Sequence, residues 1–333
     1  MKAVITTIQQ LTYPIEILAK KLNNNELIII GDKKSPKLLL SEYNLENVNY
    51  YNIEKQKKLN FKINSLLPYN SYSRKNLGYL LAMKDNDCIY ETDDDNIPQN
   101  NWEIRNKSNL AYICCPMNQW VNIYKWFTSK ELIWPRGFPL DYVKKQNDIL
   151  NSIEAIPIAD DFIIQQGLVN GSPDVDAIWR LLFDDKIYFE KDINIALEKM
   201  KWCPFNSQNT WWFKEAFPLM YLPVTCTMRT SDIWRSFVAQ RCLWQMDKKI
   251  LYYSVDVYQD RNEHDYYEDL ENELFCFLKN KKIVNILEDI ELGDDIYENL
   301  QKCYIELIQN KILEKKEFKT INAWISDCKN ILT

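Results

Sequence analysis

The sequence predicts an α/β protein whose N-terminal half contains a parallel sheet. Apolar, β-branched runs at residues 3–8 and 26–30 are typical of strands, and residues 14–22 between them carry apolar side chains at helical spacing. The same order continues with a strand at 48–53, a helix at 71–83 and a strand from residue 88 into an acidic triplet. Strand–helix–strand repetition implies parallel strands joined by right-handed crossovers.

The remainder of the chain is mixed and then helical. Short strands are expected at 111–114 and 187–189, and a helix at 231–245. Residues 269–280 and 297–314 read as charged amphipathic helices, for which packing on the rest of the chain, dimerisation and partner docking all remain open.

Composition excludes several classes of protein. The 333 residues carry a net charge of −6, which argues against nucleic-acid binding, and no apolar run approaches the ~20 residues of a membrane span. Nine cysteines without a Cys-x-x-Cys pair indicate reduced thiols in a cytoplasmic protein. His264 is the single histidine, so a multi-histidine metal site is impossible and any nucleophilic triad must use that residue.

The triplet Asp93-Asp94-Asp95 is the most informative motif. Three consecutive carboxylates repel one another, and each raises the pKa of its neighbours unless a cation lies among them. A hard divalent metal with oxygen ligands is a natural counter-charge, and Mg²⁺ typically takes one or two carboxylates plus substrate phosphates. The alternative is a solvated acidic turn.

Polar residues follow two other predicted strands. Thr6 and Thr7 end the first, and Asp32 follows the second after Gly31. Ligands of open parallel sheets bind beyond the carboxyl ends of the strands, so these residues and the triplet are expected on one rim. Asp32 is a candidate for contacting a base or ribose, although Gly-Asp is also an ordinary turn.

Arg74 and Lys75 lie in the first turn of the helix that Ser71 or Ser73 can cap. Cations are unfavourable at the positive end of a helix dipole unless an anion is bound there. This placement favours a nucleotide diphosphate site. The alternative is two solvated side chains.

Asp232 is the candidate general base. If Ser231 caps the helix, Asp232 lies in its first turn with Arg235 on the same side, which would hold the carboxylate ionised for accepting a proton from a hydroxyl. A structural Asp–Arg pair is the alternative.

A second acidic segment contains Asp174 and Asp176 at a turn leading into a helix. These residues are candidates for hydrogen bonds to sugar hydroxyls, together with Arg229 and Arg235, and helix capping is the alternative. His264, in a polar loop, is a candidate metal ligand, although a lone histidine is more often an ordinary surface or core residue.

Several of these motifs together resemble the STELLO glycosyltransferase-like family. The resemblance spans roughly residues 3–270 and is carried by segments 4–8, 31–36, 67–79, 89–96, 171–177, 216–223 and 231–244. The family is similar to the reversibly glycosylated polypeptides, which act as nucleotide-sugar mutases and share an aspartate triplet and an Asp-x-Trp segment like that at Asp232.

The resemblance implies a GT-A fold, Rossmann-like, with a mixed central sheet and a helical C-terminal region. A catalytic domain over 1–265 would comprise a nucleotide-binding half, 1–100, and an acceptor half, 101–265, followed by a helical extension over 266–333. The implied roles are as follows: Asp93 or Asp94 toward ribose or metal, Asp95 and His264 on Mn²⁺ or Mg²⁺, Asp32 toward the base, Arg74 and Lys75 toward the nucleotide or diphosphate, and Asp232 as the base of an inverting enzyme.

The resulting hypothesis is a metal-dependent glycosyltransferase that moves a sugar from a UDP- or GDP-linked donor to a hydroxyl of a saccharide or glycoconjugate. We expect it to act in surface polysaccharide or glycoconjugate synthesis, in the cytoplasm or at the inner face of the membrane. The alternatives are a nucleotide-sugar mutase and a non-catalytic nucleotide-sugar-binding partner.

Overall fold

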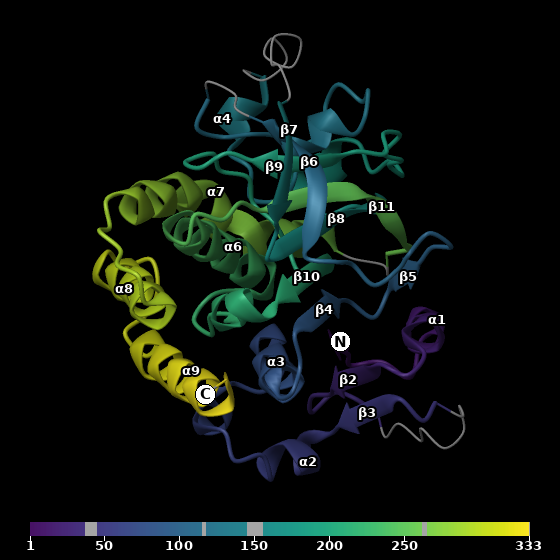
Figure 1. Ribbon diagram of the computed structural model, residues 1–333, viewed down its shortest axis with the longest axis vertical. Helices are drawn as coiled ribbons and strands as arrows, with labels where there is room; N and C mark the ends of the chain where they lie inside the picture. The colour runs from purple at the N-terminus through teal and green to yellow at the C-terminus, as the bar shows by residue number, and fades with distance from the viewer. Residues whose placement is uncertain (37–44, 115–117, 145–155, 262–264, 333) are drawn as a thin grey trace.

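The predicted α/β architecture is confirmed by the computed structural model, which describes residues 1–36, 45–114, 118–144, 156–261 and 265–332. An eleven-stranded mixed sheet runs through the molecule, with helices packed on it (Figure 1). Within the described residues no helix is long and apolar enough to cross a membrane.

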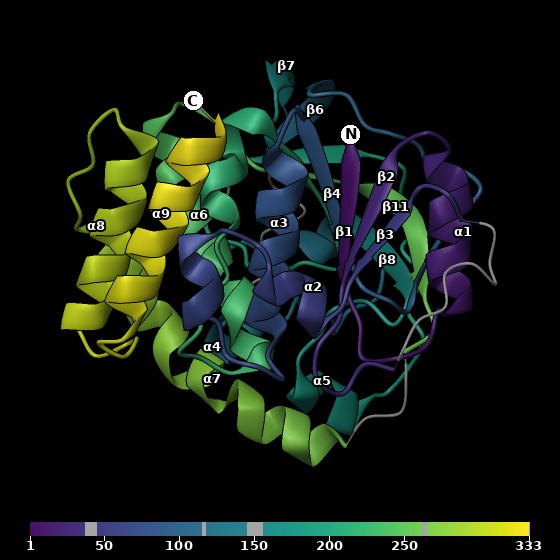
Figure 2. The ribbon, with the colours of Figure 1, turned by 90° about the horizontal axis from the view of Figure 1, so that it is seen from below.

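The N-terminal half is a four-stranded parallel unit in the order β3-β2-β1-β4. Its elements are β1 (Lys2–Thr6), α1 (Tyr13–Leu22), β2 (Glu26–Ile30), β3 (Val48–Tyr51), α2 (Ile53–Lys57), η2 (Lys62–Leu66), η3 (Tyr72–Arg74), α3 (Lys75–Met83) and β4 (Cys88–Thr92). Helix α1 lies on one face of the sheet and α3 on the other (Figure 2). Because Thr6 pairs with Ile30, β1 and β2 end level, as the sequence predicts.

Gly78 allows α3 to pack closely on the sheet. A Cβ atom at this position would lie 2.5 Å from Cγ1 of Val4 in β1, which is closer than real Cβ contacts. The absence of a side chain therefore sets how near α3 approaches β1, and with it the position of the residues at the start of this helix.

The second half of the sheet is mixed. Its strands are β5 (Asn96–Pro98), β6 (Ser108–Cys114), β7 (Ile156–Asp161), β8 (Ile164–Gly171), β9 (Asn194–Leu197), β10 (Asn209–Phe213) and β11 (Leu251–Gln259). Strand β10 joins the halves, because it pairs antiparallel with both β4 and β8. The strand predicted at 187–189 is wrong: Ile187 forms only an isolated bridge with Gly171, so no ladder extends there.

Further helices come from the second half of the chain. They include α5 (Ala177–Leu182), α6 (Met228–Gln245), α7 (Tyr266–Glu288), α8 (Ile296–Gln309) and α9 (Glu317–Leu332). The C-terminal helices pack on the rest of the chain, one of the three roles left open by the sequence. In α9, the carboxylate of Asp327 accepts the backbone N–H groups of Lys62 and Ile63 at 2.9 Å, so the end of the chain is bonded to η2. Helix α7 begins at the expected boundary, but the division into domains at residue 265 stays a prediction.

Most tryptophans belong to the core. Trp179, Trp211 and Trp212 are fully buried, and no tryptophan of the described residues lines the main cavity. Free thiols are found at Cys88, Cys203, Cys242, Cys276, Cys303 and Cys328, which are buried, and at Cys226, which is half-buried.

A buried ion pair fastens α6 to the sheet. Arg235 of α6 and Glu91 of β4 are both 0% exposed, with Nη2 2.7 Å from Oε1. Glu91 also accepts hydrogen bonds from Tyr79 and Trp212. The prediction that Arg235 contacts the acceptor is therefore wrong, because its side chain is fully buried. Arg235 is not the ion-pair partner of Asp232 either, although its charge contributes to lowering the pKa of Asp232.

We predict that Arg235→Met lowers the free energy of unfolding by about 3–5 kcal/mol, because it leaves the Glu91 carboxylate buried without its counter-charge. Urea denaturation followed by circular dichroism measures this change. Lys186→Met is the control, since its pair with Asp260 is exposed and should contribute little. An equal loss of unfolding free energy in the two variants would contradict the stabilising role of the Arg235–Glu91 pair.

Candidate active site

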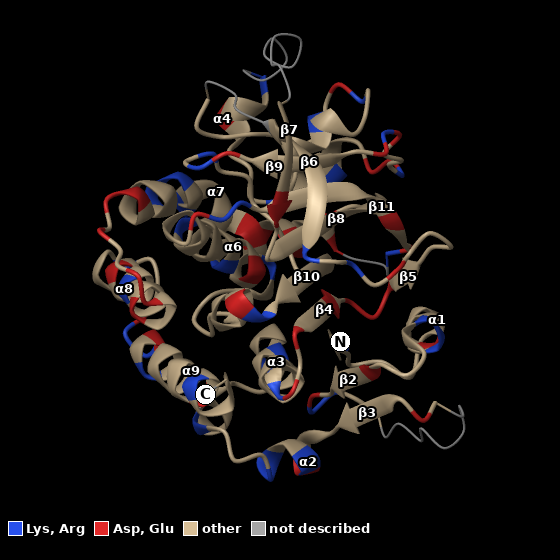
Figure 3. Ribbon diagram, in the orientation of Figure 1, with Lys and Arg blue, Asp and Glu red and all other residues tan. Residues whose placement is uncertain are grey.

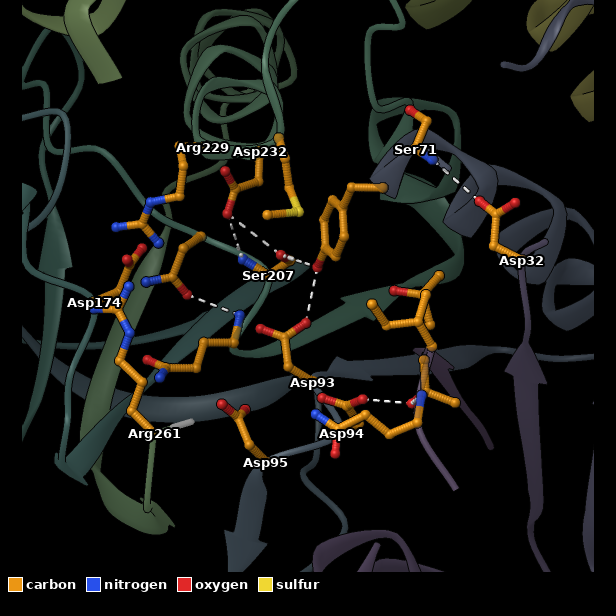
Figure 4. A pocket seen from close by; sticks show the side chains of 18 of the residues that line it. Asp32, Ser71, Asp93, Asp94, Asp95, Asp174, Ser207, Arg229, Asp232 and Arg261 are labelled. Carbon is orange, nitrogen blue, oxygen red and sulfur yellow. Dashed lines mark hydrogen bonds between the residues drawn. The ribbon is translucent and has the colours of Figure 1, made fainter. Parts of the chain in front are cut away.

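A cavity of about 620 Å³ opens where the carboxyl ends of the parallel strands meet. It lies at the point where the strand order changes direction between β1 and β4, the position at which open α/β sheets bind ligands. Its lining includes Thr6, Thr7, Asp32, Arg74, Asp93, Asp94, Asp95, Arg136, Asp174, Ser207, Arg229, Asp232, Gln259 and Arg261. Most of the predicted site residues are thus brought to one cavity (Figure 4).

The acidic triplet follows β4 and runs toward β5 (Figure 3). Each carboxylate has a different partner. Asp93 accepts from Tyr72 Oη at 2.9 Å and Lys75 Nζ at 3.2 Å, Asp94 accepts from the Thr7 hydroxyl, and Asp95 accepts from Gln259 Nε2 at 2.9 Å. Part of the repulsion expected from the sequence is therefore relieved by Lys75.

Asp95 is the least satisfied of the three. Burial, followed by the charge of Asp93, raises the pKa of Asp95 to about 7. Its Oδ1 is buried and has no hydrogen-bond partner. Burial also raises the pKa of Asp93 and of Asp94 above their ordinary values. An incoming cation would satisfy the orphaned oxygen and favour the ionised forms.

A complete metal cage is not preformed. Among the described residues, no three His, Cys, Asp or Glu side chains are arranged to hold a metal ion. His264, the third predicted ligand, lies outside the described residues. The triplet therefore suits a cation that takes its other ligands from a substrate, as Mg²⁺ commonly does.

Thr7 and Asp32 are held in place at the rim. Asp32 accepts the backbone N–H of Ser71 at 3.1 Å and that of Lys33 at 2.7 Å. This contact joins the end of β2 to the turn before α3. Asp32 remains part of the cavity wall, where the sequence places it.

The predicted contact of Lys75 with the nucleotide or diphosphate is wrong, whereas that of Arg74 stays a prediction. The Arg74 guanidinium lines the cavity but donates to Gln56 Oε1 from Nε at 2.7 Å and from Nη2 at 2.5 Å. Lys75 is 0% exposed and donates to the Thr92 carbonyl and to Tyr72 Oη, both at 2.8 Å. Both cations thus donate their hydrogen bonds to acceptors within the protein. Lys75, at the start of α3, also partly neutralises the charge of Asp93.

Asp232 lies in the cavity but not in the expected local setting. Helix α6 begins at Met228, with Thr227 as its N-cap residue, so Asp232 occupies the second turn and Ser231 is not the cap. Its ion-pair partner is Arg136, with Nη2 2.8 Å from Oδ2. Burial would raise the pKa of Asp232, but Arg136 outweighs it and holds that pKa below the ordinary value.

The second acidic segment divides into one cavity residue and one capping residue. Asp174 lines the cavity and binds Arg136, with Oδ1 2.7 Å from Nε. Asp176 is 0% exposed and caps α5, accepting the N–H of Trp179 at 2.8 Å. The prediction that Asp176 contacts a sugar is wrong, because its carboxylate is buried behind the cavity wall.

Arg229, from the first turn of α6, lines the cavity as predicted. Its Nε donates to Glu273 of α7 at 2.8 Å. Of the four residues assigned to the acceptor side, only Asp174 and Arg229 face the cavity.

Sequence reasoning missed several polar residues of the site, among them Tyr72, Arg136, Ser207, Gln259 and Arg261. Arg136 precedes Gly137, which has a φ of +86°. The Trp-Pro-Arg-Gly turn at 134–137 was the available signal, since its proline and glycine mark a specifically shaped loop. The hydroxyl and amide side chains carried no such signal.

We predict that Arg136→Met destabilises the protein more at pH 8 than at pH 5. Without the guanidinium, the Asp232 carboxylate is left buried without its ion-pair partner, so its pKa rises and protonation at lower pH relieves the penalty. Urea denaturation at both pH values measures the difference, which we expect to reach about 3–5 kcal/mol at pH 8. Lys199→Met, at the exposed pair with Asp247, is the control; an equal loss at both pH values would contradict the pairing.

Comparison with known proteins gives a consistent result. A family model described as STELLO glycosyltransferases matches residues 229–332, from the start of α6 through α9. The protein named probable glycosyltransferase STELLO2 of Arabidopsis thaliana is 30% identical over 264 residues, which are 73% of this chain and 34% of that protein. Probable glycosyltransferase STELLO1 of the same organism is 29% identical over 264 residues, 72% of this chain and 33% of that protein.

The chain spans about a third of the length of these relatives. Among solved structures, the crystal structure of GalNAc-T7 with UDP, GalNAc and Mn²⁺ covers 96% of this chain and 55% of that chain, with 12% identity and a TM-score of 0.39. The family model and the two plant relatives agree with the sequence motifs, and the chain belongs to the STELLO family.

Proposed function

We propose that this chain is a metal-dependent glycosyltransferase that moves a sugar from a nucleotide-sugar donor to a hydroxyl acceptor. The observation that carries the proposal is a single cavity with desolvated aspartates on one wall and an ionised, arginine-paired aspartate on the other. Membership of the STELLO family supports it, since the matched relatives are named probable glycosyltransferases.

The residues present fit a divalent cation. Asp95, with its unpartnered Oδ1, and Asp93 would hold Mn²⁺ or Mg²⁺, and the remaining ligands would come from the donor's phosphates. When bound, such a cation neutralises charge on the departing nucleoside diphosphate. The nucleoside would lie toward Thr6, Thr7 and Asp32, and uridine and guanosine diphosphates are the donors to test.

The chain's own residues supply the proton chemistry. Asp232, held ionised by Arg136, would accept the proton of the acceptor hydroxyl as that oxygen attacks the sugar. Asp174 and Arg136 would orient the acceptor at the same wall. We further propose an acceptor from surface polysaccharide or glycoconjugate synthesis and a location in the cytoplasm or at the inner face of the membrane.

Two substitutions separate binding from turnover. Asp95→Ala should abolish Mn²⁺-dependent binding of a nucleoside diphosphate, because it removes the least satisfied carboxylate of the rim. Asp232→Asn should weaken that binding by no more than about fivefold and lose turnover, because an amide cannot accept the proton. Calorimetry with uridine and guanosine diphosphate measures binding, and nucleotide release with acceptor measures turnover. Normal binding by Asp95→Ala would refute the metal assignment, and isomerised donor formed without acceptor would point to a mutase.

Metal binding should strengthen as the pH rises. The pKa of Asp95 in the folded protein, about 7, lies above that of an unfolded aspartate. Its contribution to stability is therefore present at low pH and lost as the pH rises through 7. Mn²⁺ must displace this proton, so the Mn²⁺-induced increase in Tm should be larger at pH 8 than at pH 5.5. Asp95→Asn should remove this dependence, and a shift that is independent of pH in the unaltered protein would contradict it.

A further inference from the structure

A continuous row of hydrogen bonds joins the two walls of the cavity. Tyr72 Oη lies 2.9 Å from Asp93 Oδ1 and 2.5 Å from Ser207 Oγ. Ser207 Oγ lies 3.3 Å from Asp232 Oδ2. In Figure 4, Ser207 stands between Asp232 above and Asp93 below. Two hydroxyls thus connect a carboxylate of the metal side with the proposed base.

The number of hydroxyl protons limits this row. Lys75 Nζ, which can only donate, already uses one lone pair of Tyr72 Oη. Tyr72 and Ser207 have one hydroxyl proton each, and the contact between them consumes one of the two. Only one hydroxyl proton is left for the two carboxylates, so Asp93 and Asp232 cannot both receive a hydroxyl donation at the same time.

Two arrangements satisfy this count. In the first, Ser207 donates to Tyr72 and Tyr72 donates to Asp93. In the second, Tyr72 donates to Ser207 and Ser207 donates to Asp232. The heavy atoms occupy the same places in both, because only the hydroxyl protons rotate. Tyr72 is half-buried at the cavity wall, and its Oη has three protein partners, Asp93, Lys75 and Ser207.

We infer that Tyr72 and Ser207 are positioning residues that couple cation binding at Asp93 to the hydrogen bonding of Asp232. The inference rests on the proposed function, which supplies the cation at Asp93. A cation on Asp93 replaces the donation from Tyr72, and the hydroxyls then turn toward Asp232 and fix the oxygen nearest Ser207. Oδ1 of Asp232 accepts from Arg136 Nη1 at 3.1 Å and from the Ile233 backbone N–H at 2.9 Å, so its donors are the same in both arrangements.

The reverse coupling follows from the same count. When residue 232 loses its negative charge, it accepts the Ser207 hydrogen bond less strongly. The hydroxyls then turn back so that Tyr72 donates to Asp93, and this donation competes with the cation for the carboxylate. Coupling between two sites is reciprocal, so a change at Asp232 must alter cation affinity by the factor with which the cation alters Asp232. The direct charge of Asp232 acts on the cation as well, but that effect does not require the Tyr72 hydroxyl.

A double-mutant cycle isolates the hydroxyl contribution. The Mn²⁺ Kd is measured by calorimetry, with uridine diphosphate present, for the unaltered protein, Asp232→Asn, Tyr72→Phe and the double variant. We expect Asp232→Asn to weaken Mn²⁺ binding about fivefold in the unaltered background. In the Tyr72→Phe background, the factor by which Asp232→Asn weakens Mn²⁺ binding should be at least about threefold smaller. The reason is that substitutions within one hydrogen-bond network do not have additive effects.

Each other outcome overturns the inference. If Asp232→Asn changes the Mn²⁺ Kd by the same factor in both backgrounds, Asp232 affects the cation only through its direct charge. If Asp232→Asn leaves the Mn²⁺ Kd of the otherwise unaltered protein unchanged, the two sites are not coupled. Absence of Mn²⁺ binding by the unaltered protein, with every nucleoside diphosphate tested, would instead refute the proposed function, and the inference with it. Ser207→Ala replaces Tyr72→Phe in a second cycle, so that loss of folding by one variant leaves the test intact.

Discussion

Burial of carboxylates at the end of a parallel sheet is the constraint on which the rest of the site depends. Removing an aspartate from water raises its pKa unless a cation or a set of donors replaces the lost solvation. On one wall Lys75 supports Asp93, while Asp95 keeps an unpartnered oxygen and a pKa of about 7. On the other, Arg136 keeps Asp232 ionised. The pKa is therefore raised for Asp95 and lowered for Asp232, because only Asp232 has an arginine paired with it.

Three cations near the cavity bind acceptors within the protein. Arg74 and Lys75 hold backbone and side-chain acceptors near α3, and Arg235 is paired with Glu91 inside the core. These contacts fix the strand ends and α6 relative to one another, so that the carboxylates point into the same space. The mixed half of the sheet completes the arrangement, because β10 pairs with β4 and is preceded by the loop that carries Ser207.

The C-terminal helices take part in the same construction. Glu273 of α7 accepts a hydrogen bond from Arg229 at the cavity wall, and the Asp327 carboxylate of α9 accepts a backbone N–H of η2 in the N-terminal half. The family match over residues 229–332 includes these helices. Helix α7 therefore supports one wall of the cavity, and α9 fastens the end of the chain to the N-terminal half.

The sequence by itself determined the features that depend on local pattern. Strand β4 and its acidic triplet, the strand ends at Thr7 and Asp32, and the membership of the STELLO family were readable, because apolar periodicity and ordered motifs are properties of neighbouring residues. Only the tertiary structure decided which charges meet. Arg136 lies 96 residues from Asp232, and Asp176 and Arg235 turn inward, so sequence spacing alone assigned them incorrectly. Ion pairs between distant segments form where packing brings them together, and that packing is a property of the whole fold.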